Sequence, residues 1–229
     1  RYEFTVRVTA RGFEGGLDAN LISRIVDPSE SSFSGWEVAT DRSQGFTDDF
    51  RIAAIGADVF IVARSFYTPQ TFVFRSQDNG RTWNQIASTR SHRDKEFALA
   101  SDGTHIYKSG GVSDDGSLNS TVWRFDGTVW IRITRDGGFP PRAGHTMLSH
   151  GGALYILGGH TSRRESLADV WRSTDGGATW TLQNADAFSA RTRFCAVGQG
   201  RSIFVLGGRA RPGNTAFLRY DVWKSDDDG

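Results

Sequence analysis

Four tryptophans recur at an almost constant spacing along the chain. Trp36, Trp83, Trp130 and Trp180 are separated by 47, 47 and 50 residues. Self-similarity at a period of about 40–50 residues is typical of repeat proteins, in which each repeat is one small unit that buries its apolar face against its neighbours. The spacing therefore predicts a repeat architecture whose units end at these tryptophans.

The stretch from Pro140 to Leu182 shows what one unit contains. Four short runs of β-branched, aromatic and aliphatic residues lie between Gly- and Asp-rich turns, at 145–149, 153–157, 169–173 and 180–182. None has the 3.6-residue period of an amphipathic helix, and such runs are typical of antiparallel strands joined by hairpins. We expect an all-β protein built from four-stranded antiparallel sheets.

Three segments of this stretch resemble the kelch repeat: R-A-G-H at 142–145, L-Y-I-L-G-G at 154–159 and D-V-W at 169–171. The resemblance implies a β-propeller of four-stranded blades. The diglycine would let the backbone turn at a point where a side chain would clash. In the second unit the diglycine is replaced by Ala63-Arg64, so the kelch pattern is weaker there.

A second resemblance is to the Asp-box, S-x-D-x-G-x-x-W, of sialidase-type (BNR) propellers. It falls between the third and fourth strands, where that family places it. The aspartate would accept backbone hydrogen bonds within a tight turn, and the tryptophan would be buried between blades. The residues concerned are Ser76, Asp78, Gly80 and Trp83 in one unit and Ser173, Asp175, Gly177 and Trp180 in another.

These observations predict that the 229 residues form a single propeller domain made of successive repeat units. Residues 1–36 form an incomplete first blade, 37–83, 84–130 and 131–180 form full repeats, and 181–229 form a last blade that lacks its final strand. We expect an excerpt of a five- to seven-bladed ring, with the natural protein continuing beyond Gly229, because a propeller leaves only short, protected sheet edges.

Composition limits the possible functions. The formal net charge is +1, which gives no reason to expect nucleic-acid binding, and no apolar run is long enough to span a membrane. The five histidines and one cysteine show no metal-ligand spacing. We expect no metal and no cofactor.

The sequence predicts a non-catalytic binding or scaffolding module, with protein partners that include acidic or glycosylated ones, within a larger assembly. Asp78 and Asp175 recur once per unit, so we interpret them as structural rather than catalytic. The alternative is a glycosidase- or oxidase-type propeller enzyme completed by residues outside this segment, and lectin-like glycan binding is a third reading. The Asp-box resemblance points to a secreted, extracellular protein.

Antiparallel topology sorts the loops onto two faces. The loops that enter the first strand and those between the second and third strands carry many arginines, whereas the opposite face is acidic. We expect the arginine-rich face to hold an acidic partner. Its arginines are Arg64, Arg90, Arg93, Arg163, Arg164, Arg209 and Arg211, with Arg135, Arg142 and Arg191 on the same side. Asn119 begins an N-glycosylation sequon, N-S-T.

Overall fold

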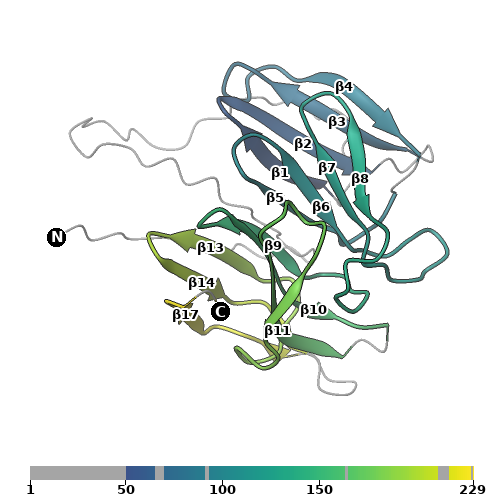
Figure 1. Cartoon of the computed structure of the whole chain (residues 1–229). Helices are drawn as coiled ribbons and strands as arrows, with labels where there is room; N and C mark the ends of the chain where they lie inside the picture. Colours follow the sequence, from purple (N-terminus) through teal and green to yellow (C-terminus); the bar gives the residue numbers. More distant parts are fainter. Residues whose placement is uncertain (1–49, 65–69, 91–92, 163–164, 211–216, 228) are drawn as a thin grey trace, which may run out of the picture.

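The computed structural model describes residues 50–64, 70–90, 93–162, 165–210, 217–227 and 229. It is an all-β propeller with four antiparallel blades (Figure 1). The first described blade contains β1 (Phe50–Ile55), β2 (Asp58–Arg64), β3 (Thr71–Ser76) and β4 (Asn84–Thr89). The second contains β5 (Ala98–Ser101), β6 (Ile106–Ser109), β7 (Val122–Phe125) and β8 (Trp130–Thr134). The predicted unit 1–36 lies outside the described residues.

The third blade contains β9 (Thr146–His150), β10 (Ala153–His160), β11 (Ser166–Ser173) and β12 (Thr181–Asn184). The last sheet contains β13 (Cys195–Gln199), β14 (Ser202–Leu206) and β17 (Val222–Ser225). A separate two-stranded ribbon, β15 (Arg209–Ala210) with β16 (Phe217–Leu218), lies in the connection between β14 and β17. In the described part of the chain, no helix is long and apolar enough to cross a membrane.

Each four-stranded blade follows the order of the sequence. In the β9–β12 blade the first three strands match the predicted runs at 145–149, 153–157 and 169–173 closely. The fourth strand of each blade begins at or just after the tryptophan that ends a sequence unit, as in β4 after Trp83 and β12 after Trp180. A blade therefore takes its outer strand from the start of the following sequence unit.

The strands differ in burial according to their place in the blade. The first strands β5 and β9 are largely buried, and β1, β5, β9 and β13 pack side by side (Figure 1). The fourth strand β12 is exposed at every residue and β4 at most of them. The first strands therefore line the inside of the propeller, and the fourth strands lie on its outside.

Hydrophobic clusters fill the spaces between blades. One of them joins Val122 of β7 to Leu154 and Ile156 of β10, with Trp180 among them. Trp180 is only 8% exposed, and its ring meets that of Phe139 edge to face, with centroids 5.5 Å apart. Trp180 therefore lies between two blades, where its large ring adds both area and aromatic contact.

Trp83 occupies the equivalent sequence position but a different environment. It is half-buried, and within the described residues it joins a cluster formed by Ile61, Ala63 and Phe74 of its own blade. The blade that would precede Trp83 lies outside the described residues, so its burial between blades stays a prediction.

The diglycines make room for rings of the next blade. A Cβ on Gly110 would lie 2.7 Å from Cε1 of His145, and a Cβ on Gly158 would lie 3.0 Å from Cε1 of Phe194. Both glycines also have positive φ, 56° and 52°. Only glycine fits both demands, because the neighbouring ring occupies the space that a side chain would need.

Among the described histidines, His145 is the one whose ring lies against a diglycine of the preceding blade, at Gly110. It is 6% exposed, and its Nε2 lies 2.9 Å from Oγ of Ser109 on β6. Burial of the imidazole, together with the nearby guanidinium of Arg142, holds the pKa of His145 well below its usual value. Phe97 and Phe194 occupy the corresponding position in the neighbouring blades.

We predict that His145→Phe makes the protein less sensitive to acid. The folded state keeps His145 neutral, whereas the unfolded chain binds a proton below a pH of about 6.5, so this residue costs stability as the pH falls. At pH 7.5 the free energy of unfolding of the variant should be about 1 kcal/mol lower than that of the unmodified protein, because Ser109 loses its partner. At pH 5.5 this difference should shrink or reverse, and urea unfolding of both proteins at the two pH values measures it. A deficit that stays constant between the two pH values would contradict the prediction.

Candidate functional site

We call the side that carries the connections before the first strand and after the second strand the loop face. The opposite side, with the hairpins between first and second and between third and fourth strands, is the hairpin face. Antiparallel pairing puts both kinds of loop connection on the same side of each blade. Interactions between loops of different blades show that the loop face is continuous across the described blades.

Two of the arginines assigned to this face are not available for a partner. Arg142 and Arg191 are fully buried, with relative exposures of 0%. Nη1 and Nη2 of Arg142 donate to the two carboxylate oxygens of Asp169 at 2.7 Å each, and Arg191 binds Asp221 in the same way at 2.9 and 2.8 Å. Neither arginine is among the predicted contact residues, and each guanidinium instead joins the start of its blade to the aspartate at its third strand.

Arg64 and Arg93 come together from two blades. Nη2 of Arg64 lies 3.5 Å from Oδ1 of Asp114, and Nη1 of Arg93 lies 2.6 Å from Oδ2 of the same carboxylate. Two cations thus share one anion. The Nε atoms of both arginines are buried and have no hydrogen-bond partner within the described residues. The two guanidinium groups and the one carboxylate together therefore keep a net positive charge.

The other predicted contact arginines are distributed more loosely. Arg90, Arg135 and Arg209 are exposed. Arg163, Arg164 and Arg211 lie outside the described residues.

In the blades that begin with β5, β9 and β13, the residue two positions before the first strand has left-handed backbone. Glu96, Gly144 and Arg193 occupy equivalent places, with φ of 52°, 60° and 52°. The backbone N–H of Gly144 donates to the carbonyl of Glu96 at 2.9 Å, and that of Arg193 donates to the carbonyl of Gly144 at 2.7 Å. Glycine adopts this conformation without cost, whereas a side chain here costs about 1–2 kcal/mol. Two blades therefore carry a charged residue where the backbone favours glycine.

These two charged residues contact one another across three blades. Nη2 of Arg193 lies 2.6 Å from Oε1 of Glu96, and Nε2 of His160 at the end of β10 lies 3.3 Å from Oε2. We call Glu96, His160 and Arg193 the cross-blade cluster. Their side chains are 29%, 19% and 39% exposed, so the cluster is open to solvent at the loop face.

The charges of the cross-blade cluster stabilise one another. The hydrogen bond from His160, followed by the contact with Arg193, lowers the pKa of Glu96 to about 2. Glu96 in turn raises the pKa of His160. A glycosidase needs a carboxyl whose pKa is raised so that it can donate a proton. This cluster instead keeps its carboxylate ionised, which suits ionic recognition.

The S-x-D-x-G-x-x-W segments lie on the hairpin face and form similar turns. Oγ of Ser173 donates to Asp175 at 2.8 Å and accepts from the N–H of Gly177 at 2.9 Å. Ser76, Asp78 and Gly80 repeat this pattern at 2.9 and 2.8 Å. Hydrogen bonds from Thr179 and Thr82 lower the pKa values of Asp175 and Asp78 to about 2. Both aspartates thus bond to their own turns.

Asn119 of the sequon is partly buried beside the loop face. Its Nδ2, the atom to which a glycan would be attached, donates to Oδ1 of Asp94 at 2.8 Å and lies 3.2 Å from Oγ of Ser113. A glycan would disturb these contacts. Within the described residues, no group of three or more His, Cys, Asp or Glu side chains could hold a metal ion.

Glu96, His160 and Arg193 are not among the contact residues predicted from the sequence. A signal was nevertheless present, because aligning R-A-G-H at 142–145 with D-K-E-F at 94–97 and R-T-R-F at 191–194 puts a charge in place of glycine twice. What the alignment could not show is that these charges meet.

The comparisons with known proteins agree with a β-propeller fold. Residues 100–226 match the model of the DUF6242 beta propeller domain. The chain belongs to this family. The match covers the whole β9–β12 blade and most of the two blades beside it.

The chain is also similar to parts of two larger proteins. Over 137 residues, 54% of its length, it is 30% identical to the tRNA wybutosine-synthesizing protein 2/3/4 of Oryza sativa subsp. japonica, of which it covers 13%. Over 100 residues, 42% of its length, it is 32% identical to Beta-scruin of Limulus polyphemus, of which it covers 10%. The similarity to Beta-scruin agrees with the kelch-like character of the repeat.

Proposed function

We propose that this propeller is a non-catalytic binding module that holds an acidic segment of a protein partner on its loop face. The observation that carries the proposal is the pair of charged residues, Glu96 and Arg193, at positions where the backbone favours glycine. Strained positions of this kind persist at functional sites because the surrounding structure compensates for their cost. The ion pair between Glu96 and Arg193 offsets part of this cost, and it also places a guanidinium at the solvent-exposed loop face.

The rest of the loop face supports recognition of anions. Arg64 and Arg93 share Asp114, so the three side chains together carry a net positive charge. Arginine presents several donors in a planar arrangement that matches a carboxylate. A carboxylate-rich segment that crosses the loop face could use this pair and Arg193 at once.

The hairpin face fits a structural role better. The turns at Ser76–Gly80 and Ser173–Gly177 have equivalent hydrogen bonds, which supports reading them as Asp-boxes whose aspartates stabilise hairpins. We accordingly keep the sequence units 37–83, 84–130, 131–180 and 181–229 as the proposed repeat. The rice relative is named for tRNA modification, but the shared part is too small a fraction of that protein to bring its activity to this chain.

The binding proposal predicts that Arg193→Gly weakens binding without weakening the fold. The probe is a fluorescent peptide of eight alternating Glu and Ser residues, and the measurement is fluorescence anisotropy at low and high salt. Loss of one charge-assisted contact, about 1.5–3 kcal/mol, should weaken binding at least tenfold. Glycine removes the backbone strain of the left-handed conformation at residue 193, which should offset the loss of the ion pair with Glu96. The free energy of unfolding should therefore stay within about 1 kcal/mol of that of the unmodified protein.

Two further variants sharpen this experiment. Arg64→Gln with Arg93→Gln should also weaken binding, whereas Arg81→Gln with Arg201→Gln, both exposed on the hairpin face, should not. The Gln/Ser version of the peptide should bind far more weakly. Equal binding by the loop-face and hairpin-face variants, or unchanged binding by Arg193→Gly, would overturn the proposal.

A further inference from the structure

Two guanidinium groups from neighbouring blades converge on one point of the loop face. Arg64 is the last residue of β2, and Arg93 lies in the connection that leads into β5 of the next blade. Nη2 of Arg64 and Nη1 of Arg93 both contact the carboxylate of Asp114. The two arginine side chains are only 19% and 21% exposed, so the surrounding structure holds most of each one in place. The pair is therefore arranged around an anion before any partner binds.

The carboxylate of Asp114 does not satisfy both arginines equally. Its Oδ2 lies 2.6 Å from Arg93, whereas its Oδ1 lies 3.5 Å from Arg64. Hydrogen bonds between nitrogen and oxygen in proteins are mostly 2.7–3.2 Å long, so the contact with Arg64 is a weak one. The space between the two guanidinium groups therefore suits an anion with more oxygens and more charge than one carboxylate.

The side chain of Asp114 can leave this place without opening its own turn. The turn at residues 113–117 is closed by its backbone, and the adjacent Asp115 supports it by accepting from the N–H of Ser117 at 2.9 Å. Asp114 is 45% exposed, and within the described residues its carboxylate forms hydrogen bonds only with the two arginines. It therefore occupies the site as a replaceable anion.

The connection that holds Arg93 adds further positive charge. Arg90 and Lys95 are exposed in it. Its two acids, Asp94 and Glu96, are each bound to a cation elsewhere. The surroundings of the arginine pair therefore favour a strongly anionic ligand.

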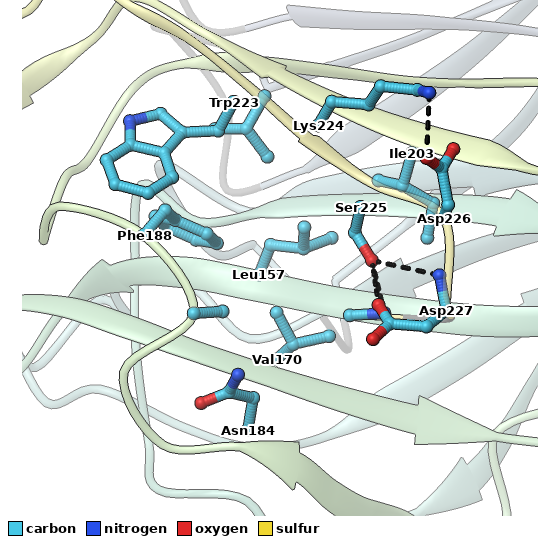
Figure 2. A pocket seen from close by; sticks show the side chains of 13 residues that line it. Leu157, Val170, Asn184, Phe188, Ile203, Trp223, Lys224, Ser225, Asp226 and Asp227 are labelled. Carbon is cyan, nitrogen blue, oxygen red and sulfur yellow. Dashed lines mark hydrogen bonds and ion pairs between the residues drawn. The ribbon is translucent and has the colours of Figure 1, made fainter.

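The ion pair at the rim of the groove in Figure 2 provides a contrast. This groove of about 420 Å³ lies between the β9–β12 blade and the last sheet. Lys224 and Asp226 at its rim bind one another at 2.8 Å, one cation to one anion. The arginine pair on the loop face has two cations for one anion instead.

We propose that Arg64 and Arg93 form a binding site for a phosphorylated serine or threonine of a protein partner, whose phosphate replaces the carboxylate of Asp114. A phosphate has three acceptor oxygens and about two negative charges at pH 7, so it can accept from both guanidinium groups and neutralise both. Clusters of arginines recognise phosphorylated segments in this way. This inference rests on the proposed function, since it names the chemistry of the acidic segment that the loop face holds.

The test compares two peptides of matched charge on the 229-residue chain. Both derive from the Glu/Ser peptide described above. In one, the second serine is phosphorylated; in the other, the second and third serines are replaced by glutamate. Because only the phosphate can bond both arginines well, the phosphopeptide should bind roughly tenfold more tightly in fluorescence anisotropy.

Three sets of variants locate the effect. Arg64→Gln with Arg93→Gln should abolish the preference for the phosphopeptide, whereas Arg193→Gly should weaken both peptides by a similar factor. Asp114→Asn should strengthen phosphopeptide binding roughly threefold, because the phosphate no longer displaces a charged group. A misfolded variant would not gain affinity. Asp115→Asn is its matched control and should have a smaller effect, because the carboxylate of Asp115 binds its own turn.

The outcomes separate this inference from the proposed function. Equal binding of the two peptides, a preference that survives in the double arginine variant, or weaker binding by Asp114→Asn would overturn the phosphate site. Binding of the glutamate peptide that still depends on Arg193 would then leave the proposed function standing. Phosphopeptide binding that needs Arg64 and Arg93 but not Arg193 would instead support the phosphate site and contradict the wider acidic surface. Tighter binding to vesicles that contain phosphorylated inositol lipids than to the phosphopeptide would also overturn the inference.

Discussion

Replacing Arg142 by methionine is expected to lower the free energy of unfolding by about 3–5 kcal/mol, because Asp169 would be left as a buried, uncompensated charge. The arginine is fully buried and the carboxylate is 12% exposed. The guanidinium also donates to the carbonyls of Pro140 and Gly158 at 3.1 and 2.9 Å. Its loss would thus leave backbone acceptors unsatisfied as well. Urea unfolding followed by circular dichroism measures the change.

Arg191→Met is the matched control for this prediction. Arg191 makes the same set of contacts, but its partner Asp221 is 39% exposed, so water can solvate the carboxylate that remains. The loss should therefore be clearly smaller. The double variant Arg142→Met with Asp169→Asn should regain part of the lost stability, because it removes the unpaired charge. Equal losses for Arg142→Met and Arg191→Met would show that burial of the partner is not what determines the cost.

Much of the fold could be predicted from local patterns. The tryptophan spacing predicted the repeat, the runs at 145–149 and 153–157 predicted strands, and the diglycine at 158–159 marked a backbone turn. Apart from the spacing, each of these signals lies within one unit. The sequence could also predict the hydrogen bonds of the turn at Ser173–Gly177, since all of its members lie within a few residues.

The candidate site could not be predicted in the same way, because its contacts join distant residues. Glu96 and Arg193 are 97 residues apart in the sequence and meet only when three blades are placed side by side. The order of the loops placed Arg142 on the loop side, and its partner Asp169 lies 27 residues further along, on the third strand of the same blade. Loop topology alone could not show which of the arginines on that side already had a partner.

Trp180→Ala is expected to lower the free energy of unfolding by about 3–5 kcal/mol, because it empties a closely packed space between two blades. The ring is 8% exposed and contacts residues of both blades, so neither blade alone can close the gap. Its N–H bond to Gly177 would also be lost.

Trp83→Ala provides the comparison for Trp180→Ala. Trp83 makes the equivalent bond, to Gly80 at 3.0 Å, but it is half-buried against its own blade, so its loss should be smaller. Trp180→Phe should recover part of the stability, since a smaller ring can keep the edge-to-face contact with Phe139 but not the hydrogen bond. Guanidinium unfolding of the three variants measures these differences. A loss below about 1 kcal/mol for Trp180→Ala would mean that the blades are held together elsewhere.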